Sequence, residues 1–429
     1  MATQGLKGRD ISLNAASCVL HQASRYSGDV GISRQSGRWA CVTVISLHIV
    51  QCSKIQHQID YGDRRLKKLS PAVARLAAMR AMAGSPMNEP KGYLKDMTAF
   101  GSNPGALRAK VHIPEQVADN PALVVVLHGC TQTAAGYDRG SGWSQLADEH
   151  GFVLLFPEQQ RSNNPNLCFN WFSPADNARD RGEALSIRQM IEAMVESHGI
   201  DASRIFVTGL SAGGAMTSIL LATYPEVFAG GAIIAGLPYG AASNVQQALE
   251  AMRGTDRYDG DALGDRVRRA AGHSGPWPSI AIWHGTADKT VGENNADEIL
   301  AQWLSVHGLG DTPTAFDRVD GYPHRFWTDA NGQIVVEDYR ITGMGHGTPL
   351  ATTGAGACGT VMPHMIEAGI SSTRKMAARW NLLNDKPAKI SAATEPTLER
   401  LHPAQPSPIA KTGVEKIISD ALRVAGLLR

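Results

Sequence analysis

The sequence predicts an α/β fold in which helices cover both faces of a mostly parallel central sheet. Short apolar or β-branched runs alternate along the chain with stretches that have helical periodicity, which is typical of strands joined by crossover helices. The predicted strands are 123–127, 152–156, 205–208, 231–234, 280–283 and 335–341. The clearest predicted helix is 183–197, with Leu185, Ile187, Met190, Ile191, Met194 and Val195 along one face.

Length and composition indicate one large domain with appendages. The chain has 429 residues, 43% of them hydrophobic, which is enough to bury a large core. We expect a poorly ordered N-terminal extension at 1–65, a short helix and linker at 66–91, and the main domain at 92–384. A Pro-rich linker and a C-terminal helix are expected at 385–429.

Charge and apolar runs exclude several classes of partner. With 41 basic and 40 acidic side chains, the net charge of +1 gives no reason to expect nucleic acid or an anionic membrane as a partner. The apolar run at 39–50 is shorter than the roughly 20 residues that a membrane span needs. The polar residues after Lys7 and Arg9 do not match a secretory signal, so localisation stays open, as does the oligomeric state. Because the six cysteines lack C-x-x-C spacing, we expect no metal.

The strand at 205–208 leads into Gly209-Leu210-Ser211-Ala212-Gly213, a G-x-S-x-G pattern followed by small residues and helix formers. In strand, turn, helix order, this pattern is typical of a nucleophilic serine on a strained turn. Side chains at Gly209 and Gly213 would clash with neighbouring elements. Ser211 is therefore the predicted nucleophile. The alternative is a Gly-Ser turn in which Ser211 only caps a helix.

A serine nucleophile needs a general base, and His346 is the predicted one. It lies in a Gly-rich loop directly after the strand at 335–341, from which its ring can reach back over the sheet. Five other histidines after Ser211 lie in contexts that direct the ring less well: His273, His284, His307, His324 and His364.

Asp288 is the predicted acid that orients the histidine. It follows the buried strand at 280–283 across a short turn, in the chain order Ser, Asp, His that α/β-hydrolases use. An aspartate that only bonds its own turn is the alternative, and three other carboxylates compete for the role: Asp297, Asp317 and Asp320.

Attack of a serine on a carbonyl group forms a tetrahedral intermediate with a negatively charged oxygen, which requires backbone N–H donors. The amide of Ala212, directly after the nucleophile, is the first predicted donor. The strand at 123–127 ends in His128-Gly129-Cys130, so the Cys130 amide is the predicted second donor. A simple tight turn at His128-Gly129 is the alternative. No cofactor is expected for this chemistry.

Several stretches together resemble the esterase family of poly(3-hydroxybutyrate) depolymerases, within the α/β-hydrolase superfamily. The stretches lie within 92–380: VVVLHGCTQTAAGYD, CFNWF, RGEALSIRQMI, HGIDASRIFVTGLSAGGAM, HGTADKTV and GMGHGTPL. The resemblance implies an extracellular or periplasmic serine esterase, with Ser211, Asp288 and His346 at its triad positions and Cys130 on its oxyanion loop. Feruloyl and acetylxylan esterases are similar in the same stretches.

The resemblance also implies a disulfide between Cys130 and Cys168, which would attach the oxyanion loop to the loop at 159–181; free buried thiols are the alternative. Trp171, in CFNWF, is the predicted substrate-binding residue. Other tryptophans could line an acyl pocket or fill the core: Trp143, Trp277, Trp283 and Trp327.

Some features point to other functions. A peptidase or thioesterase could use the same triad. The apolar stripe at 417–427 could bind polyester granules, although such stripes more often dock on their own domain.

The tail after Asn384 contains no aromatic residue and is too short for a separate polymer-binding domain. The G-x-G-x-x-G run at 354–359 does not join a strand to a helix, so we interpret it as a loop.

Overall fold

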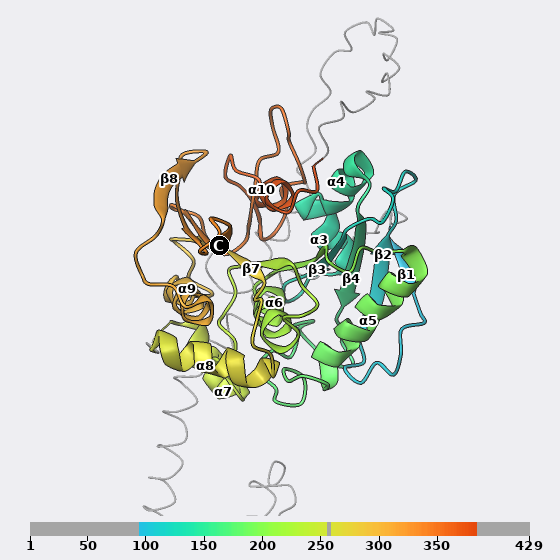
Figure 1. The fold of residues 1–429 in the computed structure, drawn as a ribbon. Helices are drawn as coiled ribbons and strands as arrows, with labels where there is room; N and C mark the ends of the chain where they lie inside the picture. Colours follow the sequence, from blue (N-terminus) through green and yellow to red (C-terminus); the bar gives the residue numbers. More distant parts are fainter. Residues whose placement is uncertain (1–93, 255–258, 384–429) are drawn as a thin grey trace, which may run out of the picture. The chain divides into compact units, whose positions relative to one another are not determined.

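The computed structural model describes residues 94–254 and 259–383 (Figure 1). The predicted segments at 1–65, 66–91 and 385–429 lie outside the described residues, as do Cys18, Cys41 and Cys52. Within the described ranges, we find no helix whose length and hydrophobicity suit a membrane span.

Ten strands form one twisted sheet in the order β1-β2-β4-β3-β5-β6-β7-β10-β9-β8. In the sheet, the six neighbouring strands β4-β3-β5-β6-β7-β10 pair in parallel. The pairs toward both edges are antiparallel. The strands are β1 (Lys95–Met97), β2 (Arg108–His112), β3 (Leu123–Leu127), β4 (Val153–Glu158), β5 (Ile205–Leu210), β6 (Gly230–Ile234), β7 (Ser279–Gly285), β8 (Ala315–Val319), β9 (Tyr322–Thr328) and β10 (Ile334–Ile341). The six predicted strands are confirmed, and they form the parallel part. A separate parallel pair contains β11 (Thr348–Leu350) and β12 (Met365–Glu367).

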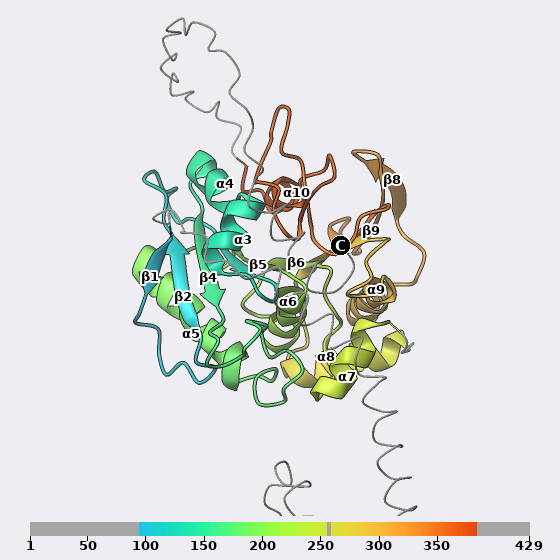
Figure 2. The same ribbon diagram turned by 180° about the vertical axis from the view of Figure 1, so that it is seen from behind.

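Helices cover both faces of the sheet, as predicted. They are α3 (Ala134–Ser141), α4 (Trp143–His150), α5 (Gly182–His198), α6 (Ala212–Thr223), α7 (Val245–Met252), α8 (Gly260–Ala271), α9 (Asn294–His307) and α10 (Ser372–Arg379). In Figures 1 and 2, α4 and α10 lie toward the top of the view, whereas α7 and α8 lie toward the bottom. The predicted helix at 183–197 is α5, which ends at Gly199 with a φ of 60°.

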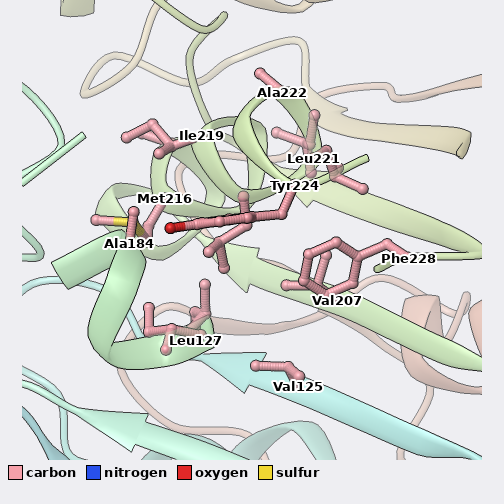
Figure 3. Close-up of a cluster of buried hydrophobic side chains, with 14 of the residues drawn as sticks. Val125, Leu127, Ala184, Val207, Met216, Ile219, Leu221, Ala222, Tyr224 and Phe228 are labelled. Atoms are coloured by element: carbon pink, nitrogen blue, oxygen red, sulfur yellow. The ribbon is translucent and has the colours of Figure 1, made fainter. Parts of the chain in front are cut away.

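Strand periodicity explains the two cores. Alternate side chains of β3 point to opposite faces of the sheet, so Val125 and Leu127 pack with α5 and α6, whereas Val124 and Val126 pack with α3 and α4. Figure 3 shows Val125, Leu127 and Val207 of the strands in the same buried cluster as Met216 of α6. Because both faces are buried, β3 is apolar throughout instead of alternating. The carboxyl ends of β3, β5, β7 and β10 then meet at one edge of the sheet.

Candidate active site

Ser211 occupies a sharp turn between β5 and α6. Its backbone has φ 59° and ψ −117°, an uncommon conformation for a residue with a side chain and one that is found mainly at functional sites. The Ser211 N–H donates to the Ile234 carbonyl of β6 at 2.9 Å, which fixes the turn to the adjacent strand. Ser211 is 9% exposed.

The two glycines of the G-x-S-x-G pattern are required by close backbone contacts. A Cβ at Gly209 would lie 2.5 Å from the Gly213 carbonyl oxygen, and a Cβ at Gly213 would lie 2.4 Å from the Leu127 carbonyl oxygen. The expectation that side chains would clash here is confirmed. The simple cap interpretation is wrong, because the Ser211 side chain accepts no N–H of α6, whereas Asn244 caps α7 through its side chain.

His346 and Asp288 form a short hydrogen bond. The two residues follow β10 and β7, which are neighbours in the sheet. The His346 Nδ1 lies 2.6 Å from the Asp288 Oδ2, and the other oxygen, Oδ1, accepts the backbone N–H groups of Thr290 at 2.8 Å and Val291 at 3.0 Å. Three hydrogen bonds thus fix the Asp288 carboxylate, and one of them also orients the His346 imidazole.

The electrostatic environment keeps Asp288 ionised. Burial raises the pKa of Asp288, but the hydrogen bond and charge of His346 and the N–H of Val291 outweigh burial, so the pKa lies below its ordinary value. A neighbouring imidazole, His284, lies 3.6 Å from the same oxygen. Burial lowers the pKa of His284, whose Nε2–H donates to the Val291 carbonyl at 3.0 Å. His284 is therefore a neutral neighbour and does not replace His346.

The competing residues make other contacts. The three carboxylates pair with cationic or imidazole side chains: Asp297 with Arg340, Asp317 with His324, and Asp320 with Lys375. Of the histidines, His273, His284 and His307 bond backbone carbonyls, His324 pairs with Asp317, and His364 donates to the His346 carbonyl at 3.2 Å. In the described part of the chain, His346 is thus the candidate base that pairs closely with Asp288.

Ser211 lies at the same sheet edge as this pair, because β5 and β7 are separated only by β6. Adjacent strands are about 4.8 Å apart, so the serine turn and the Asp288 turn begin roughly 10 Å apart. Among the described residues, no hydrogen bond joins the Ser211 hydroxyl to His346. That contact stays a prediction.

The loop after β3 brings the Cys130 amide to the same edge. The His128 Nε2 accepts the Gln159 N–H at 3.1 Å, so its proton is on Nδ1, which donates to the Gly129 carbonyl at 2.8 Å. Burial lowers the pKa of His128 to about 4, which keeps the ring neutral. Within 94–254 and 259–383, neither the Cys130 nor the Ala212 amide donates to a backbone carbonyl. In these ranges, neither predicted oxyanion donor therefore has a backbone carbonyl as its acceptor.

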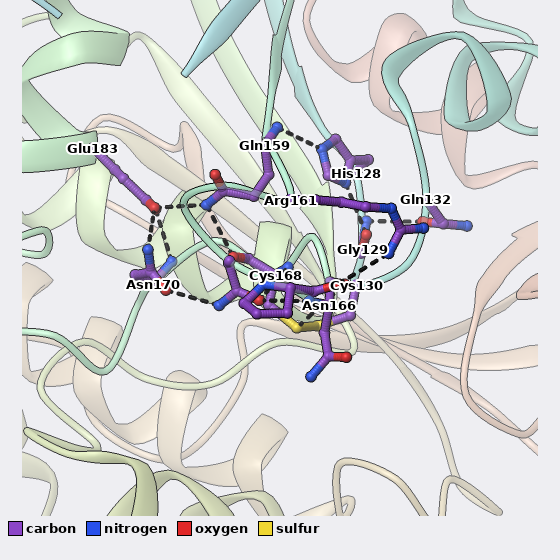
Figure 4. Close-up of a disulfide and its surroundings, with 12 residues drawn as sticks. His128, Gly129, Cys130, Gln132, Gln159, Arg161, Asn166, Cys168, Asn170 and Glu183 are labelled. Carbon is purple, nitrogen blue, oxygen red and sulfur yellow. Dashed lines mark hydrogen bonds between the residues drawn. A yellow bond between two sulfur atoms is a disulfide. The ribbon is translucent and has the colours of Figure 1, made fainter. Parts of the chain in front are cut away.

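A disulfide joins Cys130 to Cys168, as the resemblance implied (Figure 4). It links two loops that are 38 residues apart in the sequence. A second link lies beside it, because the Thr131 N–H donates to the Asn166 carbonyl at 2.7 Å. The remaining described cysteine, Cys358, is buried, and burial raises the pKa of its thiol to about 12.

Sequence reasoning missed the role of Glu183 beneath these loops. Its side chain is fully buried and accepts hydrogen bonds from the side chains of Gln159, Asn163 and Asn170. The available signal was the concentration of amide side chains at 159–170, because buried amide donors require a buried acceptor.

Most candidate tryptophans fill the core. Trp143, Trp283 and Trp327 are at most 2% exposed, so the suggestion that they line an open acyl pocket is wrong. Trp143 stacks on Trp380, and Trp283 stacks on Tyr339. Trp277 is partly buried against the core beside His273. Trp171 is 7% exposed and packs edge-on against Phe172.

Known proteins share this architecture and sequence. The family model for esterase PHB depolymerases matches residues 107–321, about half of the chain. Poly(3-hydroxyalkanoate) depolymerase C of Paucimonas lemoignei is 48% identical over 283 residues, which cover 65% of this chain and 68% of that protein. An acetylxylan esterase of Coprinopsis cinerea is 36% identical over 278 residues, 63% of this chain and 73% of that protein.

Among solved structures, the acetyl xylan esterase from Aspergillus awamori superposes with a TM-score of 0.58 at 25% identity, covering 68% of this chain and 99% of that one. The predicted α/β-hydrolase fold is thereby confirmed. Because the family model covers β2 to β8 and the serine turn, the chain belongs to the PHB depolymerase esterase family and is a carboxylic ester hydrolase.

Proposed function

We propose that Ser211 is the nucleophile of this esterase, with His346 as general base and Asp288 as the residue that orients His346. The observation that carries the proposal is the 2.6 Å hydrogen bond between His346 and Asp288 at the sheet edge where the strained Ser211 turn lies. A carboxylate bonded to Nδ1 fixes the proton there, which leaves Nε2 free to accept a proton from serine.

In the proposed reaction, the Ser211 proton passes to His346 Nε2 as Oγ forms a bond to the ester carbonyl carbon. The alcohol then leaves with the proton from His346, and an acyl-enzyme remains. Water attacks the acyl-enzyme by the same route, which releases the acid and restores Ser211. The missing Ser211 to His346 hydrogen bond is compatible with this, because such contacts are often long without substrate and tighten in the Michaelis complex.

The amides of Cys130 and Ala212 are the proposed oxyanion donors. Ala212 is the first residue of α6, so its N–H has no partner within the helix and belongs to the positive end of the helix dipole. A developing alkoxide near Ser211 would be stabilised by both groups. Loss of one such donor typically costs about 3 to 4 kcal/mol of transition-state stabilisation.

The proposed substrate is an ester of a hydroxyalkanoic acid, as a polymer or an oligomer. This choice rests on the 48% identity to poly(3-hydroxyalkanoate) depolymerase C, against 36% to the acetylxylan esterase. Trp171 remains the proposed substrate-binding residue: it follows Cys168 and Asn170 in the loop that the disulfide attaches to Cys130, although only 7% of it is exposed.

Two measurements test the proposal. Ser211→Ala should lower kcat on p-nitrophenyl butyrate by more than about a thousandfold without changing the melting temperature, and greater retained activity would exclude Ser211 as nucleophile. The wild-type enzyme should then be compared on hydroxybutyrate oligomers, feruloyl esters, acetylated xylan, a thioester and a peptide. A higher kcat/KM on any of the last four would assign a different substrate class.

A further inference from the structure

Beyond its direct connection to β3, the oxyanion loop at 128–132 is held by the neighbouring segment that follows β4. It follows β3, and three contacts attach it to the segment 159–168: the Cys130–Cys168 disulfide, the Thr131 N–H to Asn166 carbonyl bond at 2.7 Å, and the Gln159 N–H to His128 Nε2 bond at 3.1 Å. The position of the Cys130 amide therefore depends on how well the neighbouring loop is fixed.

Glu183 is the centre of the contacts that fix this neighbouring loop (Figure 4). It lies in the first turn of α5 and is 0% exposed. Its Oε1 accepts the side-chain amides of Gln159 at 2.7 Å, Asn170 at 2.7 Å and Asn163 at 3.2 Å, and its Oε2 accepts the Asn170 backbone N–H at 2.7 Å. A carboxylate accepts about four hydrogen bonds and donates none, so all of its capacity is used by this loop.

Two routes lead from Glu183 to the Cys130 amide. The Gln159 side chain bonds both Glu183 and the Cys168 carbonyl, at 2.7 and 3.0 Å, and Cys168 is covalently joined to Cys130. The Gln159 backbone N–H bonds His128, whose other ring nitrogen donates to Gly129 at 2.8 Å. Both routes pass through Gln159, and both end at the residues that carry the oxyanion amide.

We propose that Glu183 is a positioning residue for the oxyanion loop, acting through Gln159 on the Cys130 amide. The proposal rests on the proposed function, because it requires that amide to bind the oxyanion. Glu183 itself does not touch substrate, since it is fully buried and its oxygens are bonded to protein donors. Its effect is on geometry: oxyanion donors must lie at hydrogen-bond distance from the transition state, and small displacements weaken them.

The first test is Glu183→Gln, assayed with p-nitrophenyl butyrate. Glutamine has one acceptor oxygen and directs an NH2 group at neighbours that are themselves donors, so the loop loses its anchor with little change in volume. Burial raises the pKa of Glu183 to about 8, so the assay is run near pH 9, where the wild-type residue is ionised. We expect kcat to fall by about tenfold to hundredfold with KM within about twofold, less than the loss from deleting an oxyanion donor.

A transition-state analogue distinguishes positioning from general damage. Butylboronic acid forms a tetrahedral adduct with a nucleophilic serine, and its inhibition constant should rise by the same factor by which kcat falls. Gln159→Met keeps the backbone N–H to His128 but removes the side-chain link to Glu183, so it should give a similar loss. The double variant should lose no more than the larger single loss, because both variants remove the same link between Glu183 and the Gln159 side chain.

The matched control is Asp138→Asn. Asp138 is also a buried carboxyl group that accepts a backbone N–H and a side chain, but both belong to Ser144 and not to the oxyanion loop. It should lower the melting temperature and leave kcat within about twofold. An unchanged kcat in a folded Glu183→Gln or Gln159→Met enzyme overturns the proposal, as does an equal loss in Asp138→Asn or an unchanged boronate constant. If Glu183→Gln does not fold, Gln159→Met decides alone. An active Ser211→Ala enzyme would instead refute the proposed function.

Discussion

Asp288→Asn tests the proposed triad most sharply, because the surrounding contacts dictate how the new amide is oriented. Asp288 Oδ1 accepts two backbone N–H groups, from Thr290 and Val291, and Oδ2 faces His346 Nδ1 at 2.6 Å. Asparagine has one acceptor oxygen and one NH2 group. The oxygen should keep the position that faces two donors, which directs the NH2 group at His346.

This orientation of the amide changes the tautomer of the His346 imidazole. An NH2 group facing Nδ1 requires Nδ1 to accept, so the proton moves to Nε2, and Nε2 can no longer take the proton of Ser211. In a serine protease, the equivalent change lowers kcat by about 10⁴ through the same wrong tautomer. We expect a comparable loss here, which corresponds to about 5 kcal/mol of activation free energy. The fold should persist, because the substitution preserves volume and both backbone contacts.

The assay is kcat on p-nitrophenyl butyrate, with the melting temperature measured in parallel. The control is Asp297→Asn, which weakens the pair between the exposed Asp297 carboxylate and the buried Arg340 at 2.9 Å and should leave kcat within about twofold. If folded Asp288→Asn enzyme keeps more than about one hundredth of wild-type kcat, the assignment of Asp288 as the orienting residue is refuted.

Three further predictions concern stability. Gly213→Ala should lower the free energy of unfolding by about 1 to 3 kcal/mol, measured in urea, because its Cβ would lie 2.4 Å from the Leu127 carbonyl oxygen; an unchanged value would contradict the clash. Cys168→Ala should lower it by about 4 kcal/mol, since it opens a link across 38 residues, and a loss below about 1 kcal/mol would argue against this contribution. Burial raises the pKa of Glu183 from 4.5 to about 8, so the folded state holds this proton more tightly; the resulting stabilisation is complete below about pH 4.5 and is lost as pH rises through 8. Relative to Glu183→Gln, the wild-type unfolding free energy should therefore fall by up to about 5 kcal/mol over this range, and a pH-independent difference would be evidence against the shift.

The parallel part of the fold was predictable because buried parallel strands are continuous apolar runs. The prediction of 123–127 matches β3 residue for residue, and 152–156 differs from β4 by one or two residues at each end. The antiparallel edge was not predicted. In β8, the central residues Phe316, Asp317 and Arg318 are exposed, so the strand has little apolar signal and is defined by its pairing with β9.

The candidate site also contains features that the sequence predicts and features that it does not. The Ser211 turn was predictable because a local backbone requirement, glycine at positions 209 and 213, appears directly in the sequence. The pairing of His346 with Asp288 was predictable from chain order and from strand ends, and their hydrogen bond is present. The disulfide followed from family resemblance alone. Glu183 could not be predicted from periodicity, since its partners are 13 to 24 residues away in the sequence and belong to an irregular loop.

These differences imply that some parts of the site are held by the sheet and others by contacts between loops. The Ser211 turn is hydrogen-bonded to β6, and Asp288 and His346 follow adjacent strands. The positions of all three residues therefore depend on the sheet. The Cys130 amide depends instead on one covalent bond and on the loop organised by Glu183. Contacts outside the sheet open at lower free energy than core strands. Reduction of the disulfide should therefore abolish ester hydrolysis at denaturant concentrations where the far-UV circular dichroism of the sheet is still native, and coincident loss of both signals would show that the oxyanion loop and the sheet are one cooperative unit.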